Sequence, residues 1–291
     1  MLAFALPGFV PHLPRGTARV GRLAVQRFAN QELTLHLGTN VAGQPCAVIG
    51  SVAPPDEQLL ALSLAADTLV RHGAAVVTAV LPYLGYARQD RPEPGAGLGI
   101  AWVGGLLSAS GVERVVTIDV HSPRAGDLLG LPLTSLSPAA LFATELGRAG
   151  LLDAVVVAPD EGALERCRAV AVAAGITKPV ACLRKERTPS GVVHGELLGS
   201  LGPSAVVVDD ILDTGGTLIS CCRELQRRGV AEIAVMVTHG LFTGDGWRTL
   251  PSVGVRRIYV TDSVPPATRF AAEGVRLISV QALIEHAMTG I

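Results

Sequence analysis

Aromatic residues are scarce in this sequence, at 4% of 291 residues, and charged residues make up only 17%. Lys and Arg together number 24 against 25 Asp and Glu, so the chain has no basic excess that would neutralise a nucleic-acid backbone. The five cysteines include no pair at CxxC spacing, and their number is odd. We therefore expect buried thiols in a reducing cytoplasm, and neither a disulfide framework nor a zinc site.

Long hydrophobic runs of the membrane type are also lacking. Residues 1–14 carry no basic n-region and are interrupted by three prolines, which is unlike a signal peptide. The uncharged stretch 94–112 opens with a proline and three glycines and contains two serines. That composition predicts a glycine-rich loop leading into a buried helix instead of a membrane span. We expect no contact with a membrane.

Short Val- and Ile-rich runs alternate along the chain with longer segments whose apolar residues recur every three or four positions, such as Glu57–Arg71 and Gly216–Arg228. This alternation predicts parallel sheets flanked by helices. The predicted strands are Ala47–Val52, Val76–Leu81, Arg114–Asp119, Ala154–Ala158, Ala205–Asp209, Ile233–Thr238 and Arg257–Thr261.

The strand–helix pattern occurs twice, which predicts an α/β protein with two tandem domains, residues 1–137 and 138–291. Each half contains a strand that ends in an acid, Val116–Asp119 and Val206–Asp210. Ligands of such sheets bind at the carboxyl ends of the strands. The loops that follow the strands are therefore the candidate sites.

The segment Asp209–Thr217 joins a buried strand to a helix that begins near Gly216 or Thr217. Unpaired backbone N–H groups at a helix N-terminus bind phosphate directly, and the glycines let the backbone approach the anion. Asp209 and Asp210 precede this cradle, where they can accept hydrogen bonds from sugar hydroxyls and would repel a bare polyphosphate. The segment therefore predicts a site for a phosphorylated pentose.

An ordinary strand–loop–helix corner capped by Asp and Thr is the alternative, and the lack of a Lys after the glycines excludes a Walker A loop. Three aspartates and two glycines in nine residues favour the phosphate site. The segment closely resembles the ribose-5-phosphate loop of type I phosphoribosyltransferases and ribose-phosphate diphosphokinases (PRPP synthetases). The resemblance implies that ribose 5-phosphate is bound by Asp209, Asp210, Asp213, Thr214, Gly215, Gly216 and Thr217.

Two arginines and an amide follow the predicted strand Val76–Leu81 in the segment Pro82–Arg91. Arg offers a fixed fork of donors that suits polyphosphate oxygens, although a solvated basic turn has the same composition. The segment is similar to the ATP-binding segment of PRPP synthetases. That resemblance implies contacts with ATP for Arg88, Gln89 and Asp90.

Two shorter segments carry the same resemblance. Arg27–Glu32 is similar to a family segment whose Phe, Asn and Glu hold adenine from a neighbouring subunit, which implies that role for Phe28, Asn30 and Glu32. On its own, a Phe in a polar turn is more often part of a core. His121 closes a strand-end Asp-Val-His that resembles the family's Asp-Leu-His, which implies a place near the triphosphate and metal. A structural histidine is the alternative there.

The segment Pro159–Gly162 follows a predicted strand and resembles the family's diphosphate loop, Pro-Asp-x-Gly-Gly. The resemblance makes Asp160, together with His121, a candidate ligand of the Mg²⁺ that accompanies ATP. The sequence departs from the family at Ala163, which stands in place of the second Gly. We expect its Cβ to restrict the loop and the acidic Glu161 to alter the local field.

The segment Leu183–Gly191 holds three cations within four residues, which alone describes an exposed face. It resembles the family's mobile catalytic loop with its Lys-x-Arg signature, which implies catalytic roles for Lys185 and Arg187. A strand near Pro179–Leu183 followed by such a loop favours a closing lid.

The matching segments lie in family order from about Arg27 to Gly240, and an ordinary phosphoribosyltransferase is shorter and carries only the sugar loop. The resemblance therefore implies a ribose-phosphate diphosphokinase, which transfers the β,γ-diphosphoryl group of ATP to the 1-hydroxyl of ribose 5-phosphate and forms PRPP and AMP. A phosphoribosyltransferase that uses PRPP and a non-catalytic PRPP-synthetase-like regulatory protein are the alternatives.

The resemblance also implies a homo-oligomer, a dimer, tetramer or hexamer, with the ATP site near a subunit interface. The low charged fraction favours an oligomer that buries surface as well. After Asp90, the sequence lacks the basic and hydroxyl residues that the family associates with ADP and phosphate as effectors. This difference argues against ADP inhibition and phosphate activation.

Overall fold

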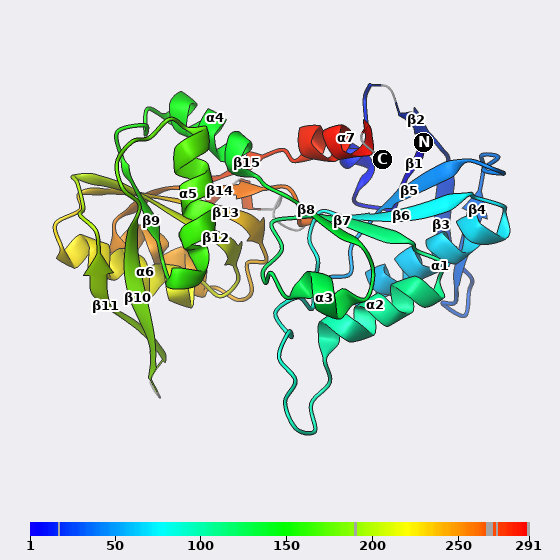
Figure 1. Cartoon of the computed structure of the whole chain (residues 1–291), viewed down its shortest axis with the longest axis horizontal. Helices are drawn as coiled ribbons and strands as arrows, with labels where there is room; N and C mark the ends of the chain where they lie inside the picture. Colours follow the sequence, from blue (N-terminus) through cyan, green and yellow to red (C-terminus); the bar gives the residue numbers. More distant parts are fainter. Residues whose placement is uncertain (17, 189–190, 266–269, 272, 290–291) are drawn as a thin grey trace. The chain divides into compact units, whose positions relative to one another are not determined.

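The computed structural model describes residues 1–16, 18–188, 191–265, 270–271 and 273–289, with the backbone alone for 185–188 and 191–194 (Figure 1). The chain divides into two compact units, each with its own sheet and core. Unit 1 comprises Met1–Leu136 and the C-terminal residues from Val280 on, and unit 2 comprises Ser137–Ser279.

Unit 1 contains a six-stranded sheet in the order β2-β1-β5-β6-β7-β8, and every neighbouring pair is parallel. The central strands are apolar and buried, as expected for a parallel sheet covered on both faces. The strands are β1 (Leu2–Ala5), β2 (Arg19–Val20), β5 (Pro45–Ile49), β6 (Val76–Leu81), β7 (Arg114–Ile118) and β8 (Leu133–Leu136).

The helices of unit 1 are η1 (Val10–His12), α1 (Glu57–Arg71), α2 (Gly99–Ala109), α3 (Ala125–Leu129) and α7 (Gln281–Thr289). In α1, Leu59, Leu62 and Leu69 are buried at helical spacing, so one stripe of the helix faces the sheet. In α2, a Cβ on Gly104 would lie 1.7 Å from the carbonyl oxygen of Leu129, so only glycine allows this close packing of α2 on α3. The glycine-rich loop leading into a helix is confirmed for residues 94–112.

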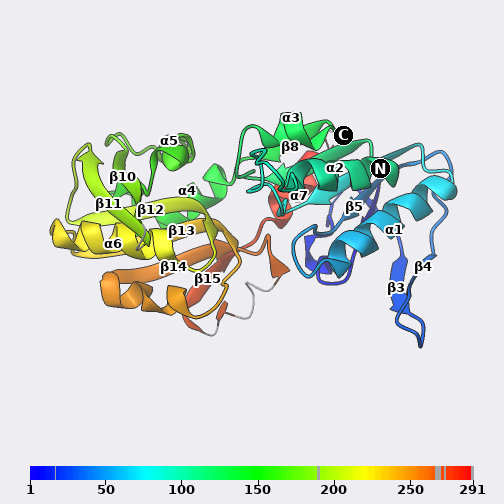
Figure 2. The ribbon, with the colours of Figure 1, turned by 90° about the horizontal axis from the view of Figure 1, so that it is seen from below.

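A two-stranded antiparallel hairpin projects from the rest of unit 1, as Figure 2 shows. It consists of β3 (Leu23–Arg27) and β4 (Leu33–Leu37), with Phe28–Glu32 at its tip. Leu23, Val25 and Leu35 pack against the core of unit 1, so the base of the hairpin is anchored while its tip is exposed.

The C-terminal helix α7 packs with the first unit although it ends the second half of the sequence. The side-chain amide of Gln281 donates a hydrogen bond of 3.4 Å to the carbonyl oxygen of Leu13, just after η1. The structural units therefore differ at this helix from the sequence halves 1–137 and 138–291, because contacts distant in sequence decide where it packs.

Unit 2 contains a seven-stranded sheet in the order β11-β10-β9-β12-β13-β14-β15. All neighbouring pairs are parallel except β10 and β11, which form an antiparallel hairpin. The strands are β9 (Val155–Ala158), β10 (Ala181–Thr188), β11 (Gly191–Leu198), β12 (Ser204–Leu212), β13 (Glu232–Gly240), β14 (Val255–Thr261) and β15 (Val275–Ile278).

The helices of unit 2 are α4 (Ala139–Ala149), η2 (Glu161–Ala163), α5 (Leu164–Ala173), α6 (Gly216–Arg227) and η3 (Gly246–Val253). They cover both faces of the sheet, and Figure 2 shows α5 and α6 on opposite sides. Along β12, Val206 and Val208 belong to the core under α4 and α5, while Val207 belongs to the core under α6 and η3. This alternation is the two-residue period of a strand buried on both faces.

The structure confirms the α/β class and mainly parallel sheets flanked by helices. Strand β6 and helix α1 have the predicted bounds, and α6 begins at Gly216. One expectation was wrong: the stretch after Leu183 is not a loop, because β10 continues to Thr188 and pairs with β11.

All five cysteines are free and buried, as expected. Burial raises the pKa of Cys46 to about 11 and that of Cys222 to about 12, so these thiols stay protonated at neutral pH and are poor nucleophiles. Within the described part of the chain, no helix is both long and apolar enough to cross a membrane.

Candidate functional site

The predicted sugar loop lies between β12 and α6. Strand β12 extends three residues beyond the predicted end at Asp209, and it pairs with β13 as far as Leu212 opposite Gly240. The side chains of Asp209 and Asp210 are therefore held on a strand and are buried. Gly215 then turns the chain with a φ of +88°, a conformation that favours glycine, and α6 starts at the next residue. Gly215, the residue before the first turn of α6, makes no side-chain capping hydrogen bond.

A second segment supports this loop from behind. A Cβ on Gly215 would lie 2.8 Å from the Cα of Trp247, and a Cβ on Gly246 would lie 2.7 Å from the carbonyl oxygen of Thr214. Trp247 is buried and packs edge-on against Phe242, with ring centroids 4.8 Å apart. The conformation of the loop is thus constrained by close backbone contact with η3.

Arg166 of α5 is the cation of this site, and no motif in the sequence pointed to it. Its guanidinium nitrogens lie 4.0 Å from Oδ1 of Asp209 and 3.7 Å from Oδ2 of Asp210. All three side chains are nearly buried, with 13%, 13% and 8% of their surface exposed. A buried carboxylate pair needs such a charge, because two anions removed from water repel each other.

Burial raises the pKa of Asp209 above the ordinary value of 3.8, and the neighbouring carboxylate of Asp210 raises it further. Arg166 acts in the opposite direction. The carboxyl group also accepts a hydrogen bond of 3.0 Å from the backbone N–H of Asp210. A carboxyl group whose pKa is displaced by burial and by a like charge, at the end of a sheet strand, is typical of a functional site.

Asp160 follows β9, the neighbour of β12 in the sheet, and caps η2. Its Oδ1 accepts a hydrogen bond of 3.2 Å from the N–H of Ala163. Ala163 has helical backbone angles, φ −86° and ψ −7°, and its side chain is buried in the core under α5. The Cβ that replaces the family's second Gly is therefore accommodated, and the expected restriction of the loop is not seen.

Lys185 and Arg187 lie on β10, in the part of this strand that extends beyond its pairing with β9 and forms the hairpin with β11. Lys185 is opposite His194 and Arg187 is opposite Val192. The side chains of both predicted catalytic residues lie outside those that the structure describes. The strand order β10-β9-β12 still brings the three predicted segments of unit 2 to neighbouring strands.

In unit 1, two of the predicted ATP segments come together. Arg88, Gln89 and Asp90 follow β6, and His121 follows the adjacent strand β7. The carboxylate of Asp90 is hydrogen-bonded to Ser122, the residue after His121, and this bond lowers the pKa of Asp90. The side chain of Gln89 packs against Gly99 at the start of α2.

The third predicted ATP segment is the tip of the β3–β4 hairpin. Its turn is closed by a hydrogen bond of 3.0 Å from the N–H of Phe28 to the carbonyl oxygen of Glu32, with Gln31 at a φ of +72°. Oδ1 of Asn30 accepts a bond of 3.2 Å from the N–H of Glu32. The side chain of Phe28 is 57% exposed, so it is not the core residue that a Phe in a turn usually is.

Asp56 and Glu57, at the N-terminus of α1, contact the segment after β6 and the β3–β4 hairpin. Sequence reasoning missed both contacts. Oδ1 of Asp56 accepts a hydrogen bond of 2.5 Å from the hydroxyl of Tyr86, within the segment that carries Arg88. Oε2 of Glu57 lies 2.7 Å from Nη2 of Arg27 at the end of β3. The N-terminus of α1 thus contacts both the hairpin and the segment after β6.

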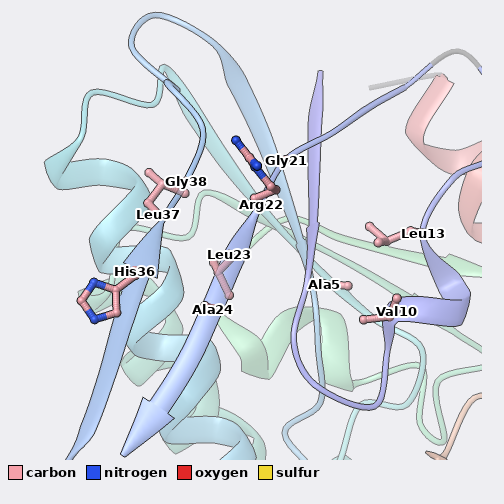
Figure 3. Close-up of a pocket in the computed structure, with 10 residues that line it drawn as sticks. All are labelled: Ala5, Val10, Leu13, Gly21, Arg22, Leu23, Ala24, His36, Leu37 and Gly38. Atoms are coloured by element: carbon pink, nitrogen blue, oxygen red, sulfur yellow. The ribbon is translucent and has the colours of Figure 1, made fainter.

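No group of three or more His, Cys, Asp or Glu side chains converges as a metal cage among the described residues. A pocket of about 580 Å³ in unit 1, shown in Figure 3, lies between η1 and the base of the hairpin. None of the predicted site residues lines it; its lining residues include Leu13, Arg22 and His36.

Residues 15–111 match the N-terminal domain of ribose phosphate pyrophosphokinase, and residues 153–291 match the phosphoribosyl synthetase-associated domain. The ribose-phosphate pyrophosphokinase of Rhizobium meliloti (strain 1021) is 31% identical over 274 residues, which cover 93% of this chain and 88% of the relative. That of Vibrio vulnificus (strain YJ016) is 33% identical over 278 residues, or 94% and 88% of the two chains.

Among solved structures, phosphoribosylpyrophosphate synthetase from Mycobacterium smegmatis is similar, with a TM-score of 0.86 and 26% sequence identity. The match covers 99% of this chain and 97% of that chain. Both halves of the sequence and the fold thus agree, and the chain belongs to the ribose-phosphate pyrophosphokinase family.

Proposed function

We propose that this protein is a ribose-phosphate diphosphokinase that transfers the β,γ-diphosphoryl group of ATP to the 1-hydroxyl of ribose 5-phosphate, forming PRPP and AMP. The observation that carries the proposal is the β12–α6 corner, where two buried carboxylates near the end of β12 are followed, after a short loop, by a twelve-residue helix. Membership of the family supports the reaction.

Two kinds of group at this corner would bind the two ends of the sugar phosphate. The backbone N–H groups from Thr214 to Thr217 and the two Thr hydroxyls are donors suited to the 5-phosphate. Asp209 and Asp210 are acceptors suited to the sugar hydroxyls, and Asp213 lies between the two sets. Binding at both ends would fix the orientation of the 1-hydroxyl, which is the main requirement for a transfer that depends on positioning.

ATP would be bound by the segment after β6 of one subunit and by the hairpin tip of a neighbouring subunit. Phe28 offers an exposed ring for stacking on adenine, with Asn30 and Glu32 beside it as polar partners of the base. Arg88, Gln89, Asp90 and His121 would contact the phosphates. The exposed hairpin tip supports a homo-oligomer, a dimer, tetramer or hexamer, in which this tip serves an ATP site near the subunit interface.

Mg²⁺ fits the donors that are present. Hard oxygen ligands are what Mg²⁺ prefers, and in nucleotide sites it takes one or two carboxylates together with substrate phosphates. The described residues offer single acids and no closed cage, in agreement with a metal held mainly by the nucleotide. We propose Asp160 and His121 as its protein ligands. When bound, the ion would neutralise charge on the phosphate oxygens.

Lys185 and Arg187 would stabilise the charge that develops on the transferring group, because phosphoryl-type transfers rely on charge neutralisation more than on covalent catalysis. No general base for the 1-hydroxyl is identified among the described side chains near the corner. The free and buried thiols support the cytoplasm as the location of this reaction.

The test is a single assay with matched omissions. ATP, Mg²⁺, ribose 5-phosphate and the protein are mixed, and AMP and PRPP are followed by mass spectrometry. Equal amounts of AMP and PRPP, both absent when the sugar is left out, are expected. Formation of ADP with a ribose bisphosphate, or of AMP without the sugar, would contradict diphosphoryl transfer.

A further inference from the structure

Glu161 lies next to Asp160, where the resemblance places a diphosphate loop, and its negative charge there needs an explanation. Its Oε1 lies 3.0 Å from Nε of Arg184 on β10. Nη1 of the same arginine lies 2.7 Å from Oε2 of Glu196 on β11. Arg184 therefore bridges two acids, one from the loop after β9 and one from the facing strand of the β10–β11 hairpin.

This bridge lies at an irregularity in the hairpin. Leu183 is opposite Leu197, but Lys185 is opposite His194, so two residues of β11 face the single residue Arg184. A β-bulge of this kind bends the strand and changes the direction of the residues that follow. Lys185 is the first residue beyond the bulge, so the course of its backbone depends on how the bulge is held.

The bulge is also held from the side of α6. Nη2 of Arg228, which follows the last residue of α6, donates a hydrogen bond of 2.7 Å to the carbonyl oxygen of Gly195 in the bulge. Nε of Arg228 lies 2.7 Å from Oε1 of Glu224 on the same helix. The base of the hairpin is thus attached to the helix that begins at the sugar loop and, through Arg184, to the loop of Asp160.

The ion pairs at the bulge are exposed, with 51%, 62% and 57% of the side chains of Arg184, Glu161 and Glu196 accessible. Exposed pairs contribute little to stability, because solvent screens them and long side chains lose entropy. Their role would be geometric, since they connect the loop after β9 and strand β11 to Arg184 at the bulge. The two acids raise the pKa of Arg184, so its positive charge is present throughout the neutral range and compensates Glu161.

We infer that Glu161 is a positioning residue which, through Arg184 and Glu196, fixes the bend of the β10–β11 hairpin and thereby directs Lys185 to the reaction. The inference rests on the proposed function for its kinetic consequence, but the contact itself does not. The alternative is that Glu161 only repels the diphosphate, in which case its effect would not depend on Arg184. Variants of both residues therefore distinguish a positioning role from repulsion.

The kinetic test is a double-mutant cycle of Glu161→Ala and Arg184→Ala. Each single variant is expected to lower kcat about tenfold, as for other small misplacements of a catalytic group, with KM for ATP and ribose 5-phosphate within about twofold of wild type. The double variant should be no slower than the singles, because the same contact is lost once. The inference would be overturned if the reduction of kcat in the double variant equalled the product of the two single reductions. A kcat within twofold of wild type in the single variants would overturn it as well.

The control is Glu165→Ala, which removes an equally acidic side chain from the first turn of α5. Glu165 is 90% exposed and pairs only weakly with Arg168 at 3.7 Å. This variant should keep wild-type kcat. If wild type and Glu165→Ala both fail to form PRPP, the proposed function is wrong, and the conformational test below still decides whether the contact fixes the hairpin.

The conformational test is hydrogen exchange of the hairpin amides without substrates. In Glu161→Ala and in Arg184→Ala, the amides of residues 185–188 and 192–194 should exchange several-fold faster than in wild type, whereas Glu165→Ala leaves them unchanged. The triple swap Glu161→Arg, Arg184→Glu and Glu196→Arg, which keeps both ion pairs with their charges reversed, should return exchange toward the wild-type rate. Unchanged exchange in both single variants would overturn the inference whatever the activity.

Discussion

Nη2 of Arg166 lies 3.7 Å from Oδ2 of Asp210, and this pair links α5 to the strand end that carries the predicted sugar site. The same guanidinium reaches Asp209 at 4.0 Å. One cation thus serves two buried carboxylates, and the protonation state of the site depends on it.

Replacing Arg166 with Met should lower the free energy of unfolding at pH 7 by about 3 kcal/mol, because it removes a cation from beside two buried carboxyl groups. The loss should become smaller as the pH falls toward 4, since protonation of Asp209 removes the repulsion. Urea unfolding at several pH values measures this. Arg168→Met, on the exposed side of the same helix, should change the stability by less than about 0.5 kcal/mol and serves as the control.

Replacing Asp209 with Asn should make the protein more stable at pH 8 while weakening sugar binding. The pKa of Asp209 is raised in the folded state, so above about pH 3.8 the native protein binds more protons than the unfolded chain, and stability falls as the pH rises through the raised pKa. Asn has no charge to bury. The gain should be about 1 kcal/mol at pH 8 and vanish near pH 4.

Calorimetric titration with ribose 5-phosphate completes the test of Asp209. Losing a charged hydrogen-bond acceptor should weaken binding by about ten- to a hundredfold. If Asp209→Asn is less stable than wild type at pH 8, burial of the charged carboxyl group does not destabilise the protein. If the variant binds the sugar phosphate as well as wild type does, this carboxyl group is not part of the site.

Gly215→Ala should weaken binding of ribose 5-phosphate at least tenfold, because the added Cβ meets the backbone of Trp247 and displaces the loop. Gly229 is the matched control: its φ of +87° is nearly the same as that of Gly215, but a Cβ there meets nothing within 4 Å. Gly229→Ala should cost about 1 kcal/mol of stability from the left-handed backbone and leave affinity unchanged. Equal affinities in the two variants would argue against a fitted anion loop.

Lys185→Ala should reduce turnover by about two to three orders of magnitude and keep the affinity for ribose 5-phosphate within about twofold. The reason is that a cation acting on developing charge contributes to the transition state and little to sugar binding. Lys178→Ala provides the control and should keep wild-type turnover, since Lys178 bonds the carbonyl oxygen of Asp153 at the opposite end of the strands. AMP release by Lys185→Ala within a few-fold of wild type would refute the catalytic role.

Phe28→Ala should raise KM for ATP about tenfold or more, because loss of a stacking ring under a base commonly costs ~1–3 kcal/mol. KM for ribose 5-phosphate should not change. Leu60→Ala on α1 removes a side chain of the same exposure, 58% against 57%, and should leave both constants unchanged. If KM for ATP rose equally in Phe28→Ala and Leu60→Ala, the cause would be the loss of any exposed apolar side chain and not the loss of stacking.

The sequence pattern predicted those elements of the fold that are determined by their own residues. The apolar run Val76–Leu81 forms β6 with those bounds, and the three- and four-residue spacing in Glu57–Arg71 forms α1. The start of α6 at Gly216 also follows from local chemistry, since Gly215 adopts the left-handed conformation that the turn needs. Of these elements, α6 follows the sugar loop directly, and its locally determined start is why the end of the loop could be predicted.

The features that sequence reasoning missed depend on contacts between distant segments. The charged stretch after Leu183 has the composition of an exposed loop, but the facing strand Gly191–Leu198 pairs with it and makes it β10. Arg166 has no local signal, because its partners lie more than forty residues away on another layer. The Cβ of Ala163 fits because the loop takes helical angles, which no motif specifies.

A crystal soaked with ribose 5-phosphate tests the β12–α6 corner most directly. We expect phosphate density within hydrogen-bonding distance of the backbone N–H groups of Thr214–Thr217, with the 2- and 3-hydroxyls facing Asp209 and Asp210. Phosphate bound elsewhere, or sugar density with its hydroxyls turned away from the two acids, would contradict the proposed site.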